Sequence, residues 1–225
     1  MRSQKTACLF SVILLIVPLV FACAASGKVV LVTGFEPFGV HSINPSQLIA
    51  ETLNGTTLNN ASIIGIVLPV DFNKSLEGAR AAIEKYHPDV ILSLGLAARS
   101  KMLNVEKIAV NFKRYPKDDG TWSFPQRIDK NGPLTRVTSL DVGVIAREIR
   151  NAGIPARQSF FAGTYICNAL FYGVLGDIKE NNMTASVGFI HVPLLETQDP
   201  EGMSLESMID AAKITIREIL GQKVD

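Results

Sequence analysis

The sequence is short of the residues that build disulfide frameworks and metal sites. Its 225 residues include three cysteines, three histidines and one tryptophan. The cysteines lack the paired spacing of zinc motifs and the histidines form no metal-binding pattern, so we expect no metal ion. Neither a serine-centred nucleophile elbow nor a phosphate-binding Walker loop is present. Disulfide-stapled scaffolds and nucleotide-hydrolysing P-loop proteins are therefore excluded.

An excess of charge of either sign is also missing. The chain carries 22 basic and 21 acidic residues, for a formal net charge of +1. Nucleic-acid-binding domains carry a strong basic surplus, so no nucleic-acid partner is expected. Low-complexity tracts are lacking as well, and 47% of the residues are hydrophobic. A chain of this kind can bury one sizeable core, which favours a single folded domain.

The N-terminal segment has the layout of a secretory signal. Arg2 and Lys5 precede an apolar run at residues 7–24 that ends in small residues. We therefore predict a signal peptide at residues 1–23, a folded domain at residues 24–225, and export from the cytoplasm. The exported protein would be secreted, periplasmic or anchored to a membrane.

Three alternatives describe how this N-terminal segment is processed. An ordinary cleavage site fits Ala22-Cys23-Ala24, and a lipoprotein signal would make Cys23 the lipidated first residue. An uncleaved signal anchor is the third. Lipidated Cys23 would attach the protein to a membrane.

Apolar runs rich in β-branched residues alternate with segments of helical spacing. Strands are predicted at residues 28–33, 61–70, 89–94, 105–112 and 185–191, and helices at residues 45–53, 73–86, 140–152, 165–180 and 205–220. This alternation predicts an α/β fold: a single three-layer α/β/α domain with a largely parallel twisted sheet flanked by helices. Residues 113–134, rich in basic residues and proline, form a long excursion that we expect to be a flap or an oligomer contact.

Cys167 is the one thiol left once Cys8 and Cys23 are assigned to the N-terminal segment. It follows Gly163 by four positions and falls in the first turn of a predicted helix. The backbone dipole and free amides of a helix N-terminus favour a thiolate, which is the reactive form. A buried structural cysteine is the alternative, because the side chain is small and apolar.

A nucleophilic thiol needs a base and a group that orients the base. His191 ends an apolar strand, at the carboxyl edge where open α/β sheets bind their ligands. Glu106 is an acid inside an apolar stretch, where an unpaired carboxylate would be costly. It is the best candidate to orient the imidazole. The alternatives are a histidine that caps a strand and an edge-strand glutamate that faces water.

These residues stand in four motifs that resemble the pyroglutamyl peptidase I family of cysteine peptidases. The motifs are Thr33-Gly34-Phe35-Glu36-Pro37-Phe38-Gly39 with Asn44-Pro45-Ser46, Glu106-Lys107-Ile108-Ala109-Val110-Asn111, Ala162-Gly163-Thr164-Tyr165-Ile166-Cys167-Asn168 and Gly188-Phe189-Ile190-His191-Val192-Pro193. They occur in the family's order and with similar spacing.

The resemblance implies a cysteine omega-peptidase that removes N-terminal pyroglutamate from peptides and needs no metal or organic cofactor. It assigns a catalytic triad to Glu106, Cys167 and His191. It also implies that Phe35 and Phe38 flank the flat lactam ring, while Asn44 fixes a loop or binds the ring's polar edge. Relatives commonly form homo-oligomers, so a homo-oligomer is expected here too.

The chain departs from the family pattern in its arginines and around one loop. Arg99 stands one position earlier than expected, and the segment after Asn111 is shorter, with Arg114 as the replacement arginine. The approach to Cys167 reads Ser159-Phe160-Phe161-Ala162 instead of Ser-Asn-Ser-Ala. An alternative function is therefore an exported non-catalytic binding protein for pyroglutamyl or lactam-like ligands. A nucleotide- or sugar-binding protein fits less well, because the glycine spacing after the first strand lacks the dinucleotide pattern.

Overall fold

Most strands of the protein lie in one twisted sheet. The computed structural model describes residues 27–221, so the predicted signal peptide lies outside the described residues. The strands are β1 (Val29–Phe35), β2 (Thr57–Leu58), β3 (Ala61–Leu68), β4 (Val90–Leu96), β5 (Leu103–Glu106), β6 (Ile108–Val110), β7 (Thr135–Val137), β8 (Ala156–Ser159) and β9 (Ser186–Val192). Seven of them form the main sheet, in the order β2-β3-β1-β4-β9-β5-β8, and β6 pairs with β7 separately.

The main sheet is mostly parallel. Strands β3, β1, β4 and β9 run parallel to one another, and β5 pairs in parallel with β8. Strand β5 is antiparallel to β9, and the short β2 is antiparallel to β3. The carboxyl ends of β1, β4 and β9 therefore meet at one edge of the sheet, which is where parallel sheets place their sites.

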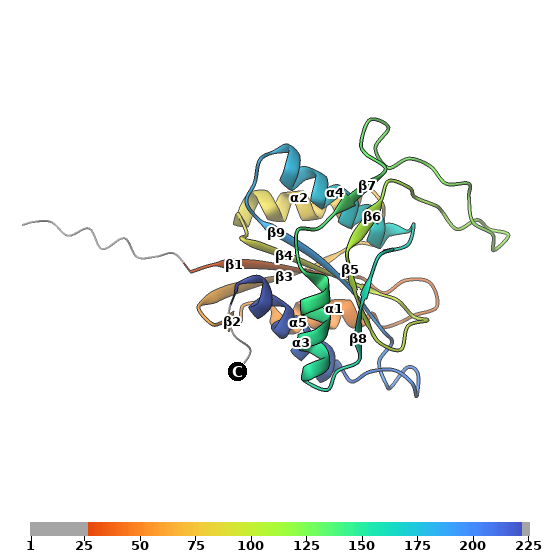
Figure 1. Cartoon of the computed structure of the whole chain (residues 1–225). Coiled ribbons are helices and arrows are strands. Elements are labelled where there is room, and N and C mark those ends of the chain that lie inside the picture. The colour runs from red at the N-terminus through yellow and green to blue at the C-terminus, as the bar shows by residue number, and fades with distance from the viewer. Residues whose placement is uncertain (1–26, 222–225) are drawn as a thin grey trace, which may run out of the picture.

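Helices cover both faces of the sheet, as the α/β/α prediction requires. They are α1 (Pro45–Leu53), α2 (Lys74–Tyr86), α3 (Val142–Asn151), α4 (Ile166–Glu180) and α5 (Leu205–Ile219). Figure 1 shows α2 and α4 on one side of the strands and α1, α3 and α5 on the other. Each side has its own apolar cluster, because alternate residues of the central strands point to opposite faces.

The loop between β1 and α1 is fixed by a polar cap at the start of the helix. Asn44 accepts hydrogen bonds from the Ser46 amide and hydroxyl, and Ser46 Oγ accepts one from the Phe35 amide. Pro45 fits the first helical position, where no amide donor is needed. A side chain at Gly34 would overlap the Ser46 carbonyl, so glycine allows α1 to pack closely on β1.

The prediction of a single strand at residues 105–112 is wrong. The chain leaves the main sheet at Lys107, which separates β5 from β6. The Lys107 amide donates to the Ser159 carbonyl, and its ammonium donates to the carbonyls of Thr138 and Leu140. These long-range bonds turn the chain so that β6 pairs with β7 outside the main sheet.

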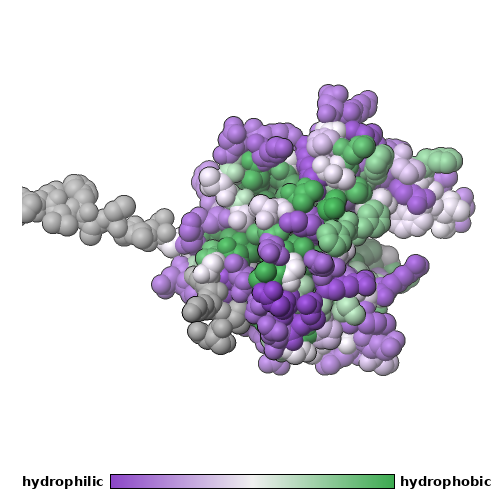
Figure 2. Space-filling model, in the orientation of Figure 1, coloured by the Kyte–Doolittle hydropathy of each residue, from purple (hydrophilic) through white to green (hydrophobic). Residues whose placement is uncertain are grey.

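Exposed apolar side chains gather where the small sheet meets the main sheet. Leu134, Val137, Phe160 and Phe161 are each more than half exposed, and Figure 2 shows apolar surface in this part of the visible face. The expected homo-oligomer remains a prediction. Within residues 27–221, no helix has both the length and the apolar character needed to cross a membrane.

Candidate active site

Cys167 lies at the carboxyl edge of the sheet, in the first turn of α4. Gly163 adopts a φ of 82°, a left-handed conformation that suits glycine and turns the chain into the helix. Tyr165 is the N-cap and supplies no side-chain cap within the described structure. The first backbone amides of α4 therefore receive no bond from that side chain, and they belong to the same helical turn as the half-buried thiol.

Glu106 and His191 form a buried pair on neighbouring strands. Asn104 lies opposite His191 across β5 and β9, so Glu106, two residues further on, points to the same face. His191 Nδ1 lies 2.8 Å from Glu106 Oε1, and the Glu106 side chain is only 2% exposed. Glu106 Oε2 is buried and has no hydrogen-bond partner among the described residues. A buried carboxylate held by one histidine is costly for stability, which favours a chemical role for it.

The environment of His191 favours its protonated form. Burial alone would lower the pKa of His191. Hydrogen bonds to the side chains of Cys167 and Glu106, together with the negative charge of both, outweigh burial and raise the pKa from 6.5 to about 10. His191 therefore holds its proton at neutral pH, beside the side chains of Glu106 and Cys167. A histidine that holds a proton beside a thiol can act chemically as a general acid.

Gly95 provides the space that the thiol occupies. Gly95 pairs with His191 in the register of β4 and β9, so a side chain above Gly95 lies beside the imidazole. A Cβ atom built on Gly95 would lie 2.7 Å from Cys167 Sγ and 3.0 Å from Phe189 Cζ. Alanine at this position would therefore displace the thiol of Cys167.

We expect Gly95→Ala to lower kcat by about 100-fold with little change in folding, because a shift of roughly 1 Å in a reacting atom has this effect. Steady-state kinetics and thermal unfolding measure the two quantities. The matched control is Gly188→Ala on neighbouring β9, where the new methyl group would meet the flexible ends of Leu140 and Leu92 instead. Equal activity of the Gly95 and Gly188 variants would contradict the placement of the thiol.

A small apolar pocket opens beside Cys167. It is lined by Phe35, Phe38, Asn44, Val70, Leu96, Tyr165, Ile166 and Cys167. The two phenylalanines come from β1 and the loop after it. Asn44 donates to the Glu36 carbonyl over 3.0 Å besides capping α1, so its observed bonds hold the loop that carries Phe38.

Sequence reasoning missed the residues that hold the site together. Asn168 is fully buried, and its amide bonds both the N–H and the carbonyl of Val110 and also the Phe112 carbonyl. It thereby ties α4, the helix that carries Cys167, to the segment that follows Glu106. Asn111, also buried, bonds five backbone groups between residues 128 and 133. An asparagine inside an apolar motif was the available signal, because a buried amide must be hydrogen-bonded.

The two arginines at which the chain departs from the family pattern occupy different surroundings. Arg99 is exposed after β4. Arg114 donates from its side chain to the Ser123 carbonyl and from its backbone amide to the Thr164 carbonyl. Its observed bonds thus fix the segment after Asn111 against the approach to Cys167.

The fold and this site define a class of protein: an α/β domain with cysteine, histidine and glutamate side chains at the carboxyl edge of a mostly parallel sheet. Comparison with known proteins narrows the class. The pyroglutamyl peptidase family profile matches residues 28–222. A pyrrolidone-carboxylate peptidase of Bacillus velezensis is 37% identical over 193 residues, which cover 83% of this chain and 90% of the relative.

Solved structures agree with the sequence match. The pyrrolidone carboxyl peptidase of Thermococcus litoralis superposes with a TM-score of 0.80 at 34% identity, covering 86% of this chain and 94% of that one. Pyroglutamyl peptidase I of Bacillus amyloliquefaciens gives a TM-score of 0.80 at 35% identity, covering 88% and 99%. The chain belongs to the pyroglutamyl peptidase family.

Proposed function

We propose that the chain is a cysteine omega-peptidase that hydrolyses the bond after an N-terminal pyroglutamate. The observation that carries the proposal is the position of Cys167, which lies beside His191 and also lines the pocket of Phe35 and Phe38. A planar, neutral lactam ring suits an apolar slot between aromatic side chains. A charged N-terminus would lose its hydration there, which explains selection for the cyclised residue.

In the first step, the Cys167 thiolate attacks the carbonyl carbon that joins pyroglutamate to the next residue. The oxyanion that forms accepts hydrogen bonds from the first backbone amides of α4, and each such donor contributes roughly 10²-fold to the rate. His191 gives its proton to the leaving amine as the C–N bond breaks. The peptide without its first residue departs, and a pyroglutamyl thioester remains on Cys167.

In the second step, neutral His191 accepts a proton from water, and the resulting hydroxide attacks the thioester carbonyl. Collapse of the intermediate breaks the C–S bond, releases pyroglutamate and restores the thiolate beside protonated His191. Glu106 keeps Nδ1 of the imidazole protonated and orients the ring throughout. No step of this proposed mechanism uses a metal ion.

Hydrolysis of a fluorogenic pyroglutamyl amide by the full-length protein tests the proposal. The matched substrate is the prolyl amide, which has the same ring size but a cationic amine and no lactam carbonyl. We expect turnover of the pyroglutamyl amide alone. Binding of pyroglutamyl amide without turnover would instead support the non-catalytic binding protein, which the family match does not favour.

We also propose that the protein is exported, with residues 1–23 acting as the signal and residues 24–225 as the catalytic domain. This rests on Arg2, Lys5 and the apolar run at residues 7–24. The mass of the N-terminal peptide from the host's own protein tests it. A free N-terminus at residue 23, 24 or 25 or a lipidated Cys23 is expected, and an N-terminus at residue 1 on a cytoplasmic protein would contradict export.

A further inference from the structure

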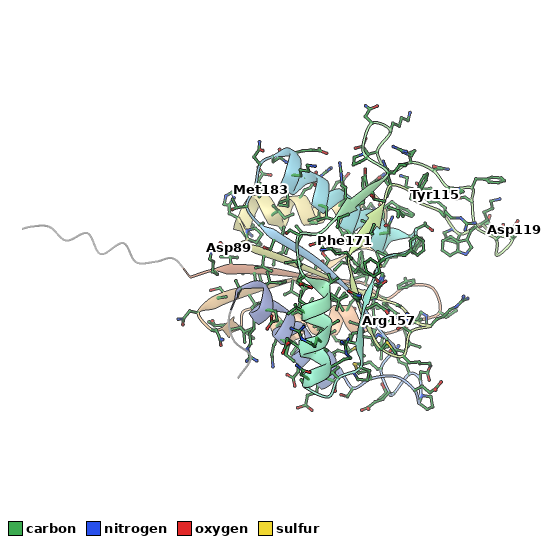
Figure 3. The ribbon with its side chains drawn as sticks, viewed as in Figure 1. Asp89, Tyr115, Asp119, Arg157, Phe171 and Met183 are labelled. Atoms are coloured by element: carbon green, nitrogen blue, oxygen red, sulfur yellow. The ribbon has the colours of Figure 1, made fainter. Side chains whose placement is uncertain are left out.

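The segment after Asn111 forms a hairpin that reaches beyond the sheet. Residues 113–126, here called the aromatic hairpin, are bridged at Lys113 with Gln126 and at Pro116 with Trp122. Its turn includes Gly120, which has a φ of 78°. In Figure 3, Asp119 marks its outer end, and Tyr115 lies nearer the body of the protein. The root is anchored, because Asn168 bonds the Phe112 carbonyl and the Arg114 amide donates to the Thr164 carbonyl.

Aromatic side chains join this hairpin to the rim of the pocket. The Tyr115 ring centroid lies 4.6 Å from that of Phe72, and the Trp122 ring lies 5.5 Å from that of Tyr165. Phe72 and Tyr165 are in turn 5.4 Å apart. Phe72, Tyr115, Trp122 and Tyr165 therefore form one cluster, and Tyr165 belongs both to it and to the pocket beside Cys167.

The cluster is more exposed than a structural core would be. Trp122 remains 44% exposed in spite of its contact with Tyr165, and the other three rings are half-buried. Large exposed aromatic surface beside a catalytic pocket is typical of ligand contacts. The pocket beside Cys167 is small, so the rest of a bound peptide must lie outside it, next to its rim.

We propose that this aromatic cluster binds the side chain of the residue that follows pyroglutamate, and that it favours aromatic and large apolar side chains there. The inference rests on the proposed peptidase function. The aromatic hairpin belongs to the segment after Asn111, in which this chain departs from the family pattern. Stacking against Trp122 and Tyr115 would hold the leaving part of the peptide and so raise kcat/KM for such substrates.

Two dipeptide amides, pyroglutamyl-phenylalanine amide and pyroglutamyl-alanine amide, test the preference on the full-length protein. We expect kcat/KM to be about tenfold higher for the phenylalanine substrate, the size of one good aromatic contact. Trp122→Ala should bring this ratio close to one, because the loss of kcat/KM falls mainly on the phenylalanine substrate. Phe124→Ala is the matched control, since Phe124 lies on the same hairpin but takes no part in the three ring contacts that define the cluster, and it should keep the wild-type ratio.

Trp122 is the single tryptophan of the chain, so its fluorescence reports binding without turnover. In Cys167→Ala protein, pyroglutamyl-phenylalanine amide should change this fluorescence, whereas free pyroglutamate amide should not. Hydrolysis of both dipeptides with a ratio near one in the wild type, or a ratio unchanged in folded Trp122→Ala, would overturn the inference and leave the proposed function intact. Hydrolysis of neither dipeptide would overturn both.

Discussion

Cys167→Ala is expected to lower kcat/KM for a pyroglutamyl amide by about 10⁵-fold, the scale seen when a covalent nucleophile is removed. The half-buried thiol is the only one in residues 27–221, and no neighbouring thiol there can replace it. Because the variant keeps the apolar pocket, it should still bind pyroglutamyl compounds. Steady-state hydrolysis and a binding titration measure the two effects separately.

Two control variants test whether the loss of activity is specific to the Cys167 thiol. Cys23→Ala removes a thiol that the proposed mechanism does not use and should retain full activity. Cys167→Ser keeps the shape of the side chain but supplies a hydroxyl that His191 cannot hold ionised, so its activity should also be close to nil. A folded Cys167→Ala protein with more than about one hundredth of wild-type activity would exclude a covalent mechanism through this residue.

Glu106→Gln is expected to lower kcat by about 10⁴-fold without unfolding the protein, because removal of the orienting carboxylate of a catalytic histidine has effects of this order. Glutamine preserves the shape of the side chain and can still accept from His191 Nδ1. It loses the negative charge that supports the imidazolium. Glu84→Gln, an exposed change on α2, is the matched control and should be silent. Equal kcat in the two variants would remove Glu106 from the mechanism.

The same variant should change the pH profile. In the wild type, activity should fall as the pH rises through about 10, where His191 loses the proton that the proposed mechanism transfers to the leaving amine. Without the Glu106 charge the pKa of His191 falls, so the alkaline limb of kcat/KM should move to lower pH. An alkaline limb at the same pH in both proteins would contradict the assignment of that limb to this pair.

The raised pKa also links stability to pH. Folded protein holds a proton on His191 that the unfolded chain releases above its ordinary value of 6.5. The stabilisation from this group is therefore complete below pH 6.5 and is lost as the pH rises toward 10.

Hydrophobic patterns in the sequence predicted the helices and the central strands correctly. They did not predict where the chain leaves the main sheet. The five helices and the central strands follow from apolar periodicity, which is a property of short segments. The break at Lys107 has no such signal, because residues 105–112 are apolar on both sides of it. That break depends on carbonyls of Ser159, Thr138 and Leu140, which come from distant parts of the chain.

In the candidate site, too, some residues could be predicted from the sequence and others could not. Cys167, His191 and Glu106 could be chosen from the chemistry of rare or costly residues, and the structure brings them together at one edge of the sheet. Gly95 and Asn168 could not, because their roles depend on which atoms lie across from them in space. The aromatic cluster was likewise hidden, since its rings come from three separate segments.

The most direct test of the account is the mass of the protein quenched in acid during turnover of an activated pyroglutamyl ester. Such an ester acylates faster than the thioester hydrolyses, so the acyl-enzyme should accumulate. The account predicts one pyroglutamyl group per chain, located on the proteolytic peptide that contains Cys167 and absent from Cys167→Ala. An acyl group on a different residue, or equal labelling of the two proteins, would contradict it.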